Sequence, residues 1–317
     1  MKNKILKNLP LLITIALFIV LFVYGAIAYD FTLKTFFNRL NSNAYLIVVT
    51  VGITFVLISG GIDISVGSAV AFASMFSAWM LREGLPPAVV IAIVLLVGAG
   101  FGAFMGSLIQ YFKIQPFIAT LSGLFLLRGM CAVISVDAIA IRDPFYRSMA
   151  LNKLTIANAN LYYYVLLALF VIVAAWYVMR YTRFGRNIYA IGGSEQSALL
   201  MGLPVAKTKV SVYAVSGFCA ALGGVIFSVN TLAGQALQNV GMELDAISSA
   251  VIGGVQLTGG VGTPVGSLFG VLIQGIIQEI VIYENLNTWW TKIVNAALLC
   301  IFIVMQRMIA IRAASRK

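Results

Sequence analysis

Three ionisable side chains lie inside long apolar runs of this chain, where a charge is costly. Asp63 stands in the stretch GGIDISVG, residues 60–67, while Arg128 and Glu279 each lie alone in an apolar run. An ionisable group at membrane depth costs about 2.5–3.5 kcal/mol on insertion scales, so it is expected to face protein or water rather than lipid. Asp63 can be satisfied by backbone amides, by Ser65 or by a cation, and Arg128 is a candidate partner.

The residues around Asp63 interrupt a helix. Gly60 and Gly61 each make a helix less stable than alanine would, by roughly 1 kcal/mol. A broken helix at membrane depth is viable where it packs in protein or lines a wet cavity. Asp63 is expected to cap the next helix by accepting from the amides of Ser65 or Val66, and this role is compatible with a place near a substrate pathway.

A second glycine-rich stretch has the same pattern. SGGIDISVGS, residues 59–68, aligns with TGGVGTPVGS, residues 258–267, in the paired glycines and in V-G-S. We expect two similar helix breaks on the same side of the membrane. The residues assigned by hypothesis to a helix break or substrate pathway are Gly60, Gly61, Asp63, Ser65, Gly67, Gly259, Gly260 and Gly262.

Several kinds of catalytic chemistry lack their usual residues. The chain has no histidine, which removes the commonest metal ligand and the commonest general base at neutral pH. Cys131, Cys219 and Cys300 lie in apolar runs without pairing or metal spacing, and no P-loop motif occurs. We therefore expect no enzyme activity, no metal and no cofactor in this chain. If ATP drives the protein, another chain must bind it.

The elements that carry these residues are apolar helices. The 317 residues are 61% hydrophobic and 10% charged, against about 25% charged in soluble proteins. A membrane-spanning helix needs roughly 20 apolar residues, and the chain offers about ten such runs. The sequence predicts one all-α, polytopic membrane domain over residues 1–317, with the first run retained as an anchor rather than cleaved as a signal peptide. The predicted spans are 9–29, 44–60, 64–81, 88–110, 116–135, 161–179, 210–232, 244–258, 265–282 and 291–308, of which the second and eighth are short.

The distribution of Lys and Arg predicts the orientation. With ten spans and a cytoplasmic N-terminus, thirteen of the 21 cations fall inside, seven fall outside, and Arg128 lies within a span. Both termini are therefore expected in the cytoplasm. The net charge of +11 is largely a signal of this topology, and no nucleic-acid partner is expected.

Two loops are longer than the others. Residues 136–160 lie outside and either meet a soluble partner or simply connect two spans. Residues 180–209 lie inside and contain a predicted short helix, with Ser194 as N-cap and Glu195 and Gln196 in the first turn. Gly202 and Pro204 end this helix. Helices this short are marginal alone, so it is expected to dock, with Leu199, Leu200 and Met201 on one side.

Polar residues in the later spans indicate the kind of solute. A carrier driven by protons or sodium would have more intramembrane ionisable groups, so a neutral, hydroxyl-rich substrate fits better. Glycines at spacing four, at Gly98, Gly102, Gly106 and again at Gly266 and Gly270, are expected to pack helices closely. The polar residues are Asn230, Gln235, Gln238, Asn239, Gln256, Gln274, Gln278 and Asn295.

Three motifs resemble one family over nearly the whole chain. GGIDISVG, GRNIYAIGGSEQSALLMGL and GGVQLTGGVGTPVG are similar to the permeases of bacterial ABC importers for monosaccharides such as ribose, xylose and galactose, and most similar to galactofuranose permeases. The branched-chain amino-acid permeases are more distant. The resemblance implies a ten-helix inner-membrane subunit that moves sugar by alternating access.

The resemblance also implies partners and a coupling site. It implies a second permease, identical or related, a periplasmic sugar-binding protein and a cytoplasmic ATPase that binds the ATP. The implied ATPase-coupling residues are Gly193, Ser194, Glu195, Gln196, Leu199 and Gly202. The alternative is a stand-alone facilitator or channel for a small neutral solute, and an intramembrane enzyme ranks third. The sugar itself is not readable from this chain.

Overall fold

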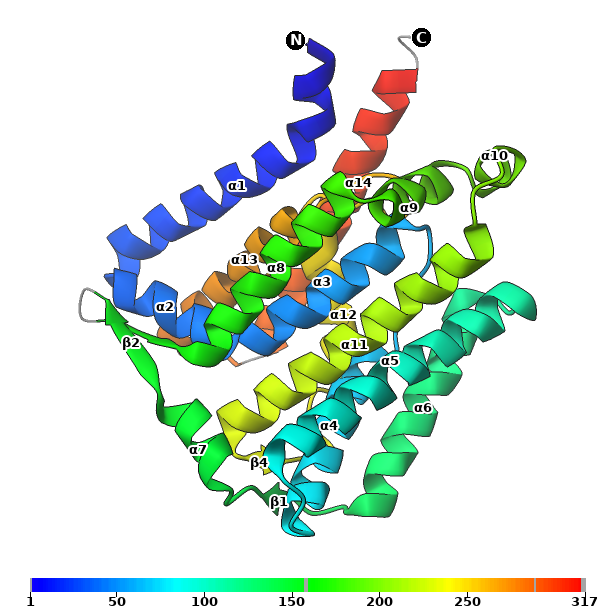
Figure 1. The fold of residues 1–317 in the computed structure, drawn as a ribbon. Helices are drawn as coiled ribbons and strands as arrows, with labels where there is room; N and C mark the ends of the chain where they lie inside the picture. Colours follow the sequence, from blue (N-terminus) through cyan, green and yellow to red (C-terminus); the bar gives the residue numbers. More distant parts are fainter. Residues whose placement is uncertain (1, 157–158, 288, 315–317) are drawn as a thin grey trace.

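The computed structural model is a bundle of helices with small strands at one end (Figure 1). It describes residues 2–156, 159–287 and 289–314, and the side chains of residues 10–155, 159–287 and 289–308. The predicted inner cations Arg316 and Lys317 lie outside the described residues. The helices are α1 Lys2–Tyr29, α2 Leu33–Ser42, α3 Ala44–Ile58, α4 Val66–Arg82, α5 Pro87–Tyr111, α6 Pro116–Ile134, α7 Pro144–Leu151, α8 Tyr163–Tyr181, α9 Arg183–Gly193, α10 Glu195–Leu200, α11 Val205–Thr231, α12 Met242–Ile252, α13 Pro264–Tyr283 and α14 Trp289–Ala314. The strands are β1 Ile139–Ala140, β2 Lys153–Ile156, β3 Ala159–Tyr162 and β4 Ala233–Gly234.

Each of the ten predicted spans overlaps one helix, although the eighth, 244–258, is helical only to Ile252, where Gly253 and Gly254 end the helix. Among the described residues, seven helices are long and apolar enough to cross a membrane, or eight if α2 and α3, bent by 62°, form one span. The helices α3, α4 and α12 are shorter, with 15, 17 and 11 residues. The all-α polytopic prediction is thus confirmed, including the short second and eighth runs. The count of ten spans stays a prediction.

The centre of the bundle is formed by α3 and α11. Every residue of α3 except Tyr45 is buried, whereas most of the apolar windows of α1 and α14 lie on the surface. The α5 and α11 backbones touch, because a Cβ atom at Gly102 would overlap the Tyr213 carbonyl and one at Gly98 would lie 2.7 Å from the Gly217 carbonyl oxygen. The predicted close packing at these glycines is confirmed.

The described residues of the loop over 136–160 form short regular elements. Its β1 pairs antiparallel with β4, which follows α11, and its β2 pairs with β3. The Asp143 carboxylate caps α7 by accepting from the amides of Phe145 and Tyr146 at 2.8 and 3.2 Å, and Tyr146 is fully buried. The loop therefore packs on the bundle. Its contact with a soluble partner stays a prediction.

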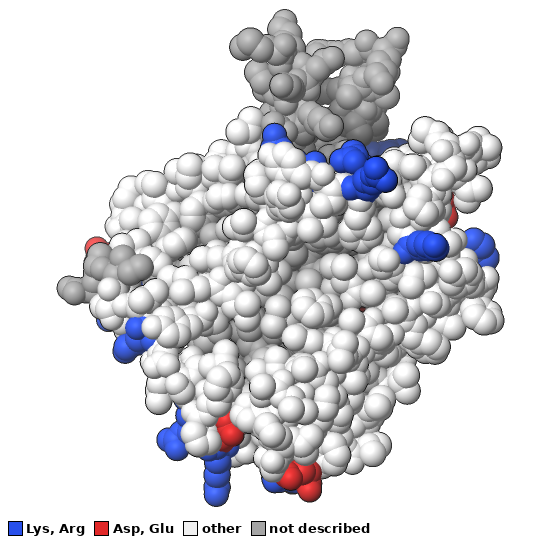
Figure 2. Space-filling model, in the orientation of Figure 1, with Lys and Arg blue, Asp and Glu red and all other residues white. Residues whose placement is uncertain are grey.

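The two ends of the bundle differ. The beginning of α1 and the end of α14 lie at the same end as α9 and α10, and β1, β4 and α7 lie at the opposite end (Figure 1). On the face shown in Figure 2, charged side chains gather toward the ends and a broad uncharged band lies between them. This pattern fits a membrane belt with α9 and α10 on the cytoplasmic side, as predicted from the Lys and Arg distribution.

The contact between α5 and α11 predicts the effect of a single methyl group. Gly102→Ala should lower the free energy of unfolding by about 1–3 kcal/mol, because the added Cβ meets backbone that cannot move aside. Thermal unfolding of the purified full-length chain in detergent measures it. Gly100→Ala on the same helix is the control, since its Cβ would meet nothing within 4 Å. Equal melting temperatures would contradict the proposed packing.

Candidate functional site

Asp63 is buried where the chain crosses between α3 and α4, with 3% of its surface exposed. Its carboxylate accepts from the amide of Ser65 at 3.0 Å, from the Ser65 hydroxyl at 2.6 Å, and from the Ser216 hydroxyl on α11 at 2.7 Å. The Tyr213 hydroxyl holds the same segment by donating to the Ile62 carbonyl at 3.2 Å. The predicted bond from the Ser65 amide to the Asp63 carboxylate is therefore present, and Ser216 of α11 provides an additional anchor.

Arg128 is not the partner of Asp63, so that prediction is wrong. The Arg128 guanidinium donates instead to the carbonyl oxygens of Ala236 and Gln238 at 2.6 and 2.8 Å. These carbonyls belong to the segment between β4 and α12, which leaves the α11 helix and so has free backbone acceptors. Glu279 forms an ion pair with Arg39 of α2, and this accounts for the other charge in an apolar run.

The two predicted helix breaks meet in space. The Gly260 amide, in the second break, donates to the carbonyl oxygen of Ile58 at the end of α3, at 2.8 Å. A Cβ atom on Gly259 would lie 3.0 Å from the Cα of Gly60. Gly259 and Gly260 have φ angles of +85° and +75°, which suit glycine. The similarity of the two stretches thus corresponds to a direct backbone contact between them.

The end of α9 completes this contact. A Cβ atom on Gly192 would overlap the Ile58 carbonyl oxygen and lie 2.5 Å from the Gly260 amide nitrogen. The Tyr189 hydroxyl donates to the Gly262 carbonyl at 2.8 Å, and burial raises the pKa of this hydroxyl, so it remains a donor. We call the contact of Ile58 and Gly60 with Gly192 and with Gly259 and Gly260 the glycine junction. It joins both breaks to α9.

The predicted capped helix follows directly on the glycine junction. The Ser194 hydroxyl accepts from the Ser197 amide at 3.2 Å, α10 runs from Glu195 to Leu200, and Gly202 has a φ of +73°. These features confirm the predicted cap and stop. Gly193, Gln196, Leu199, Leu200 and Met201 are all exposed, with Leu200 82% exposed.

The Glu195 carboxylate forms an ion pair within the chain and is still partly exposed. Its carboxylate accepts from the Lys209 ammonium of α11 at 2.6 Å, and 44% of the Glu195 side chain remains exposed. The pair ties α10 to the start of α11. The exposed apolar side of α10 is left without a partner in the described chain, as expected of a docking surface.

The helices α12 and α13 form a hairpin that leads away from the glycine junction. The hairpin has three rungs: Gly253 packs against Gly266, Ser249 packs against Gly270, and the Gln274 amide donates to the Asp245 carbonyl at 3.2 Å. Each rung is four residues from the next, so one face of each helix makes all three. The predicted close packing at Gly266 and Gly270 is confirmed.

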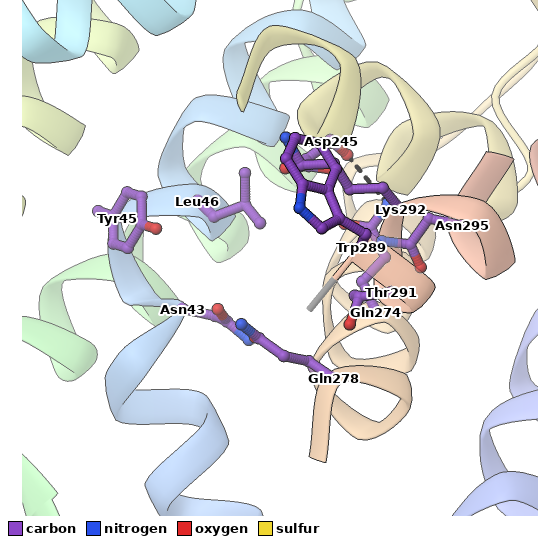
Figure 3. A pocket seen from close by; sticks show the side chains of 11 residues that line it. Asn43, Tyr45, Leu46, Asp245, Gln274, Gln278, Trp289, Thr291, Lys292 and Asn295 are labelled. Atoms are coloured by element: carbon purple, nitrogen blue, oxygen red, sulfur yellow. Dashed lines mark hydrogen bonds between the residues drawn. The ribbon is translucent and has the colours of Figure 1, made fainter. Parts of the chain in front are cut away.

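A polar pocket of about 360 Å³ lies at the far end of this hairpin (Figure 3). It is lined from four places: the bend between α2 and α3, the first turn of α12, the second half of α13 and the first turns of α14. Figure 3 shows the Gln278 side chain extended toward Asn43, with Trp289, Thr291 and Asn295 on the α14 side. Three polar residues noted in the sequence, Gln274, Gln278 and Asn295, are thus brought together.

Sequence reasoning missed two parts of this arrangement. Residues 183–193 form the helix α9, whereas the sequence predicted only one short helix in this loop, beginning after Ser194. The contact of Gly192 and Gly193 with the two breaks was also missed, and the only signal for it is that all three segments contain paired glycines. Gly67, by contrast, is remote from the junction and packs against Glu243 of α12.

The arrangement suits movement of a solute better than a reaction. Among the described residues no group of three or more His, Cys, Asp or Glu side chains could hold a metal ion. The site offers instead two helix breaks, a capped helix with an exposed apolar side, and a polar pocket connected through a glycine-packed hairpin. Breaks of this kind occur in transporters, where they line the pathway or allow helices to move.

Comparison with known proteins gives a consistent result. A family model described as the permease component of a branched-chain amino acid transport system matches residues 35–303. The inner membrane ABC transporter permease protein YjfF of Escherichia coli is 45% identical, covering 95% of this chain and 92% of YjfF. No solved structure matches the chain.

Other relatives are named as sugar import permeases. The fructose import permease protein FruG of Bifidobacterium longum is 36% identical, over 95% of this chain and 91% of FruG. The ribose import permease protein RbsC of Haemophilus influenzae is 34% identical, over 92% of this chain and 90% of RbsC. The similarity in each case extends through both helix breaks and the α9–α10 segment, because it spans nearly the whole chain.

Removal of the buried carboxylate should destabilise the first break. Asp63→Ala leaves the Ser65 amide and the Ser65 and Ser216 hydroxyls without their acceptor, at a cost of about 1–3 kcal/mol for each donor that stays buried and unpaired. We expect a clear drop in melting temperature or in folded yield. Ser216→Ala, which removes one donor, should have a smaller effect. An Asp63→Ala protein as stable as the wild type would show that the break does not depend on this carboxylate.

The glycine junction makes a second prediction. Gly192→Ala should lower the melting temperature, because its Cβ would overlap backbone of both breaks. Gly193→Ala, one residue further on, is the matched control, since nothing lies within 4 Å of its Cβ. If both variants have the same melting temperature as the wild type, the end of α9 is not in close contact with the two helix breaks.

Proposed function

The chain belongs to the family of branched-chain amino acid transport system permease components, as a multi-pass protein of the inner membrane, and we propose that it carries a monosaccharide as one subunit of an ATP-driven importer. The chain is a transport component and not itself an enzyme. The named sugar permeases among its relatives support a sugar as the solute rather than an amino acid.

The single observation that carries the proposal is the position of α10. This capped helix presents exposed Leu199, Leu200 and Met201, and the residues just before it contact both helix breaks through the glycine junction. A partner that binds α10 therefore acts on the segments that interrupt the transmembrane helices. A channel that works alone would not need such a connection.

The proposed mechanism is alternating access. A cytoplasmic ATPase docks on Gly193–Gly202, which includes Ser194, Glu195, Gln196 and Leu199, and moves α10 when it binds and hydrolyses ATP. The glycine junction transmits this movement to α3 and to the α12–α13 hairpin. The spans then rock against a second permease, and a polar path opens first outward and then inward.

The remaining partners follow from the same proposal. A periplasmic sugar-binding protein delivers the solute at the end opposite α10, and a second permease, identical or related, completes the path. ATP is bound by the ATPase chain alone, because this chain has no P-loop motif. The sugar to test first is galactofuranose, which the sequence resemblance implies.

Gentle solubilisation of the native membrane tests the assembly. The tagged full-length chain is purified and the co-purifying proteins are identified by mass spectrometry. We expect an ATPase with P-loops and a second permease. If the chain comes out alone while cells still take up a sugar down its gradient, the importer proposal fails and the stand-alone facilitator takes its place.

A charge swap tests the role of Glu195. Glu195→Arg places a second cation beside Lys209 and reverses the charge at the docking helix, so sugar uptake should fall by about tenfold or more while the chain stays in the membrane. The double variant Glu195→Arg with Lys209→Glu restores the internal ion pair and is the matched control.

The comparison of the two variants separates docking from folding. If docking depends on the charge of Glu195, uptake stays low in the double variant and ATP hydrolysis is no longer coupled to uptake. Uptake that returns to the wild-type rate in the double variant, or that never falls in the single one, would contradict a docking role for Glu195.

A further inference from the structure

We propose that the pocket between α3, α12, α13 and α14 is a monosaccharide-binding site within this permease. The inference rests on the proposed function and adds a location to it: the solute is held by this chain itself, next to the α12–α13 hairpin. The volume of the pocket, about 360 Å³, is within the range of small-molecule sites.

The lining of the pocket suits a neutral ligand with many hydroxyl groups, because its one acidic and one basic residue have opposite charges and the other residues are polar or apolar. Carboxamides from three elements reach it, those of Asn43, Gln278 and Asn295. A carboxamide has both donors and acceptors, so it can bind a hydroxyl in either sense. The Trp289 ring adds a flat apolar surface, held by the Lys292 ammonium 5.0 Å from the ring centroid. Sugar rings have an apolar face and polar edges, which is the same combination.

Two polar atoms at the pocket wall lack a partner among the described residues. They are the Oδ1 atom of Asn295, a residue that is 7% exposed, and the Oγ1 atom of Thr291. A buried polar atom without a hydrogen bond costs about 1–3 kcal/mol. Both atoms come from the first turns of α14, on the side that faces the pocket in Figure 3. Ligand hydroxyls that enter the pocket, with a small shift of α14, would satisfy them.

The hairpin connects the pocket to the ATPase side. Asp245 and Gln274 form the rung at the pocket, and Gly253 and Gly266 form the rung nearest the glycine junction. Gln274 lies ten residues after the start of α13, about 15 Å along the helix. A movement of the junction therefore changes the pocket wall, because glycine packing leaves little slack between α12 and α13. The pocket is placed where alternating access can load and release it.

The test uses the assembled importer in proteoliposomes with its binding protein. Uptake of radiolabelled D-galactose, whose solution contains the furanose form, D-ribose and D-fructose is measured for the wild type, Gln278→Leu and Asn295→Leu. Gln278 is exposed, and the Asn295 Oδ1 atom has no hydrogen-bond partner among the described residues. The substitutions therefore remove no described hydrogen bond of the Gln278 carboxamide or of Asn295 Oδ1. Asn38→Leu is the control, because Asn38 is an exposed carboxamide of α2 outside the pocket.

The expected result is a selective loss of transport. Each pocket variant should lower uptake of the transported sugar by about tenfold, which is the loss of roughly one hydrogen bond, while Asn38→Leu stays within about twofold of the wild type. The ATPase should co-purify with all of them. If the wild type moves sugar and both pocket variants move it equally well, the pocket is not the site. If the wild type moves none of the sugars, the proposed function fails, and this inference with it.

A labelling experiment measures binding without transport. The full-length importer carries Gln278→Cys in a Cys300→Ala background, since Cys131 and Cys219 are buried. The transported sugar, at about ten times the concentration that saturates uptake by the wild type, offsets the weaker binding expected without the Gln278 carboxamide and should slow maleimide labelling at position 278 several-fold, whereas glycerol at the same concentration should not. Equal labelling rates with sugar and with glycerol would overturn the site.

Discussion

The structure depends on one close backbone contact, between the end of α9 and the two helix breaks. The Ile58 carbonyl accepts from the Gly260 amide, and Gly192 packs on both groups where no side chain fits. Helix packing in a membrane gains little from the hydrophobic effect, so contact between backbones and satisfied polar groups must provide much of it. The glycine junction provides both, and it places the end of α9 against the two segments that interrupt the bundle.

The other features extend from this contact in two directions. In one direction α10 follows at once, capped by Ser194 and tied to α11 through the ion pair of Glu195 with Lys209. Toward the opposite side, the α12–α13 hairpin keeps its two helices in register through glycines and through the bond from Gln274 to the Asp245 carbonyl. Asp63 belongs to the same system, because its bond to Ser216 fixes the first break on α11. A docking helix and a polar pocket are thus connected by elements that have little room to move independently.

The sequence predicted the parts of this arrangement better than their contacts. Apolar runs located all ten segments, and cap and stop residues located α10, because these signals are local in the chain. The predicted pairing of Asp63 with Arg128 was wrong. Two isolated opposite charges in apolar runs are natural candidates for an ion pair, but Arg128 binds the backbone carbonyl oxygens of Ala236 and Gln238, and every residue type has such a carbonyl. The glycine junction and the pocket join segments that lie about 200 and about 250 residues apart in the sequence, and no sequence periodicity reports contacts of that range.

The most direct test of the account is a pair of distances measured by pulsed EPR in the assembled importer. Spin labels are placed on exposed Arg186 of α9 and Thr258 of the second break, and separately on Arg186 and Leu237 at the opposite end, with Cys131, Cys219 and Cys300 replaced by alanine. A rigid glycine junction requires the same 186–258 distance without nucleotide and with nucleotide trapped by vanadate, while alternating access shifts the 186–237 distance. A change in the 186–258 distance would show that α9 and the break move independently, and would contradict the account.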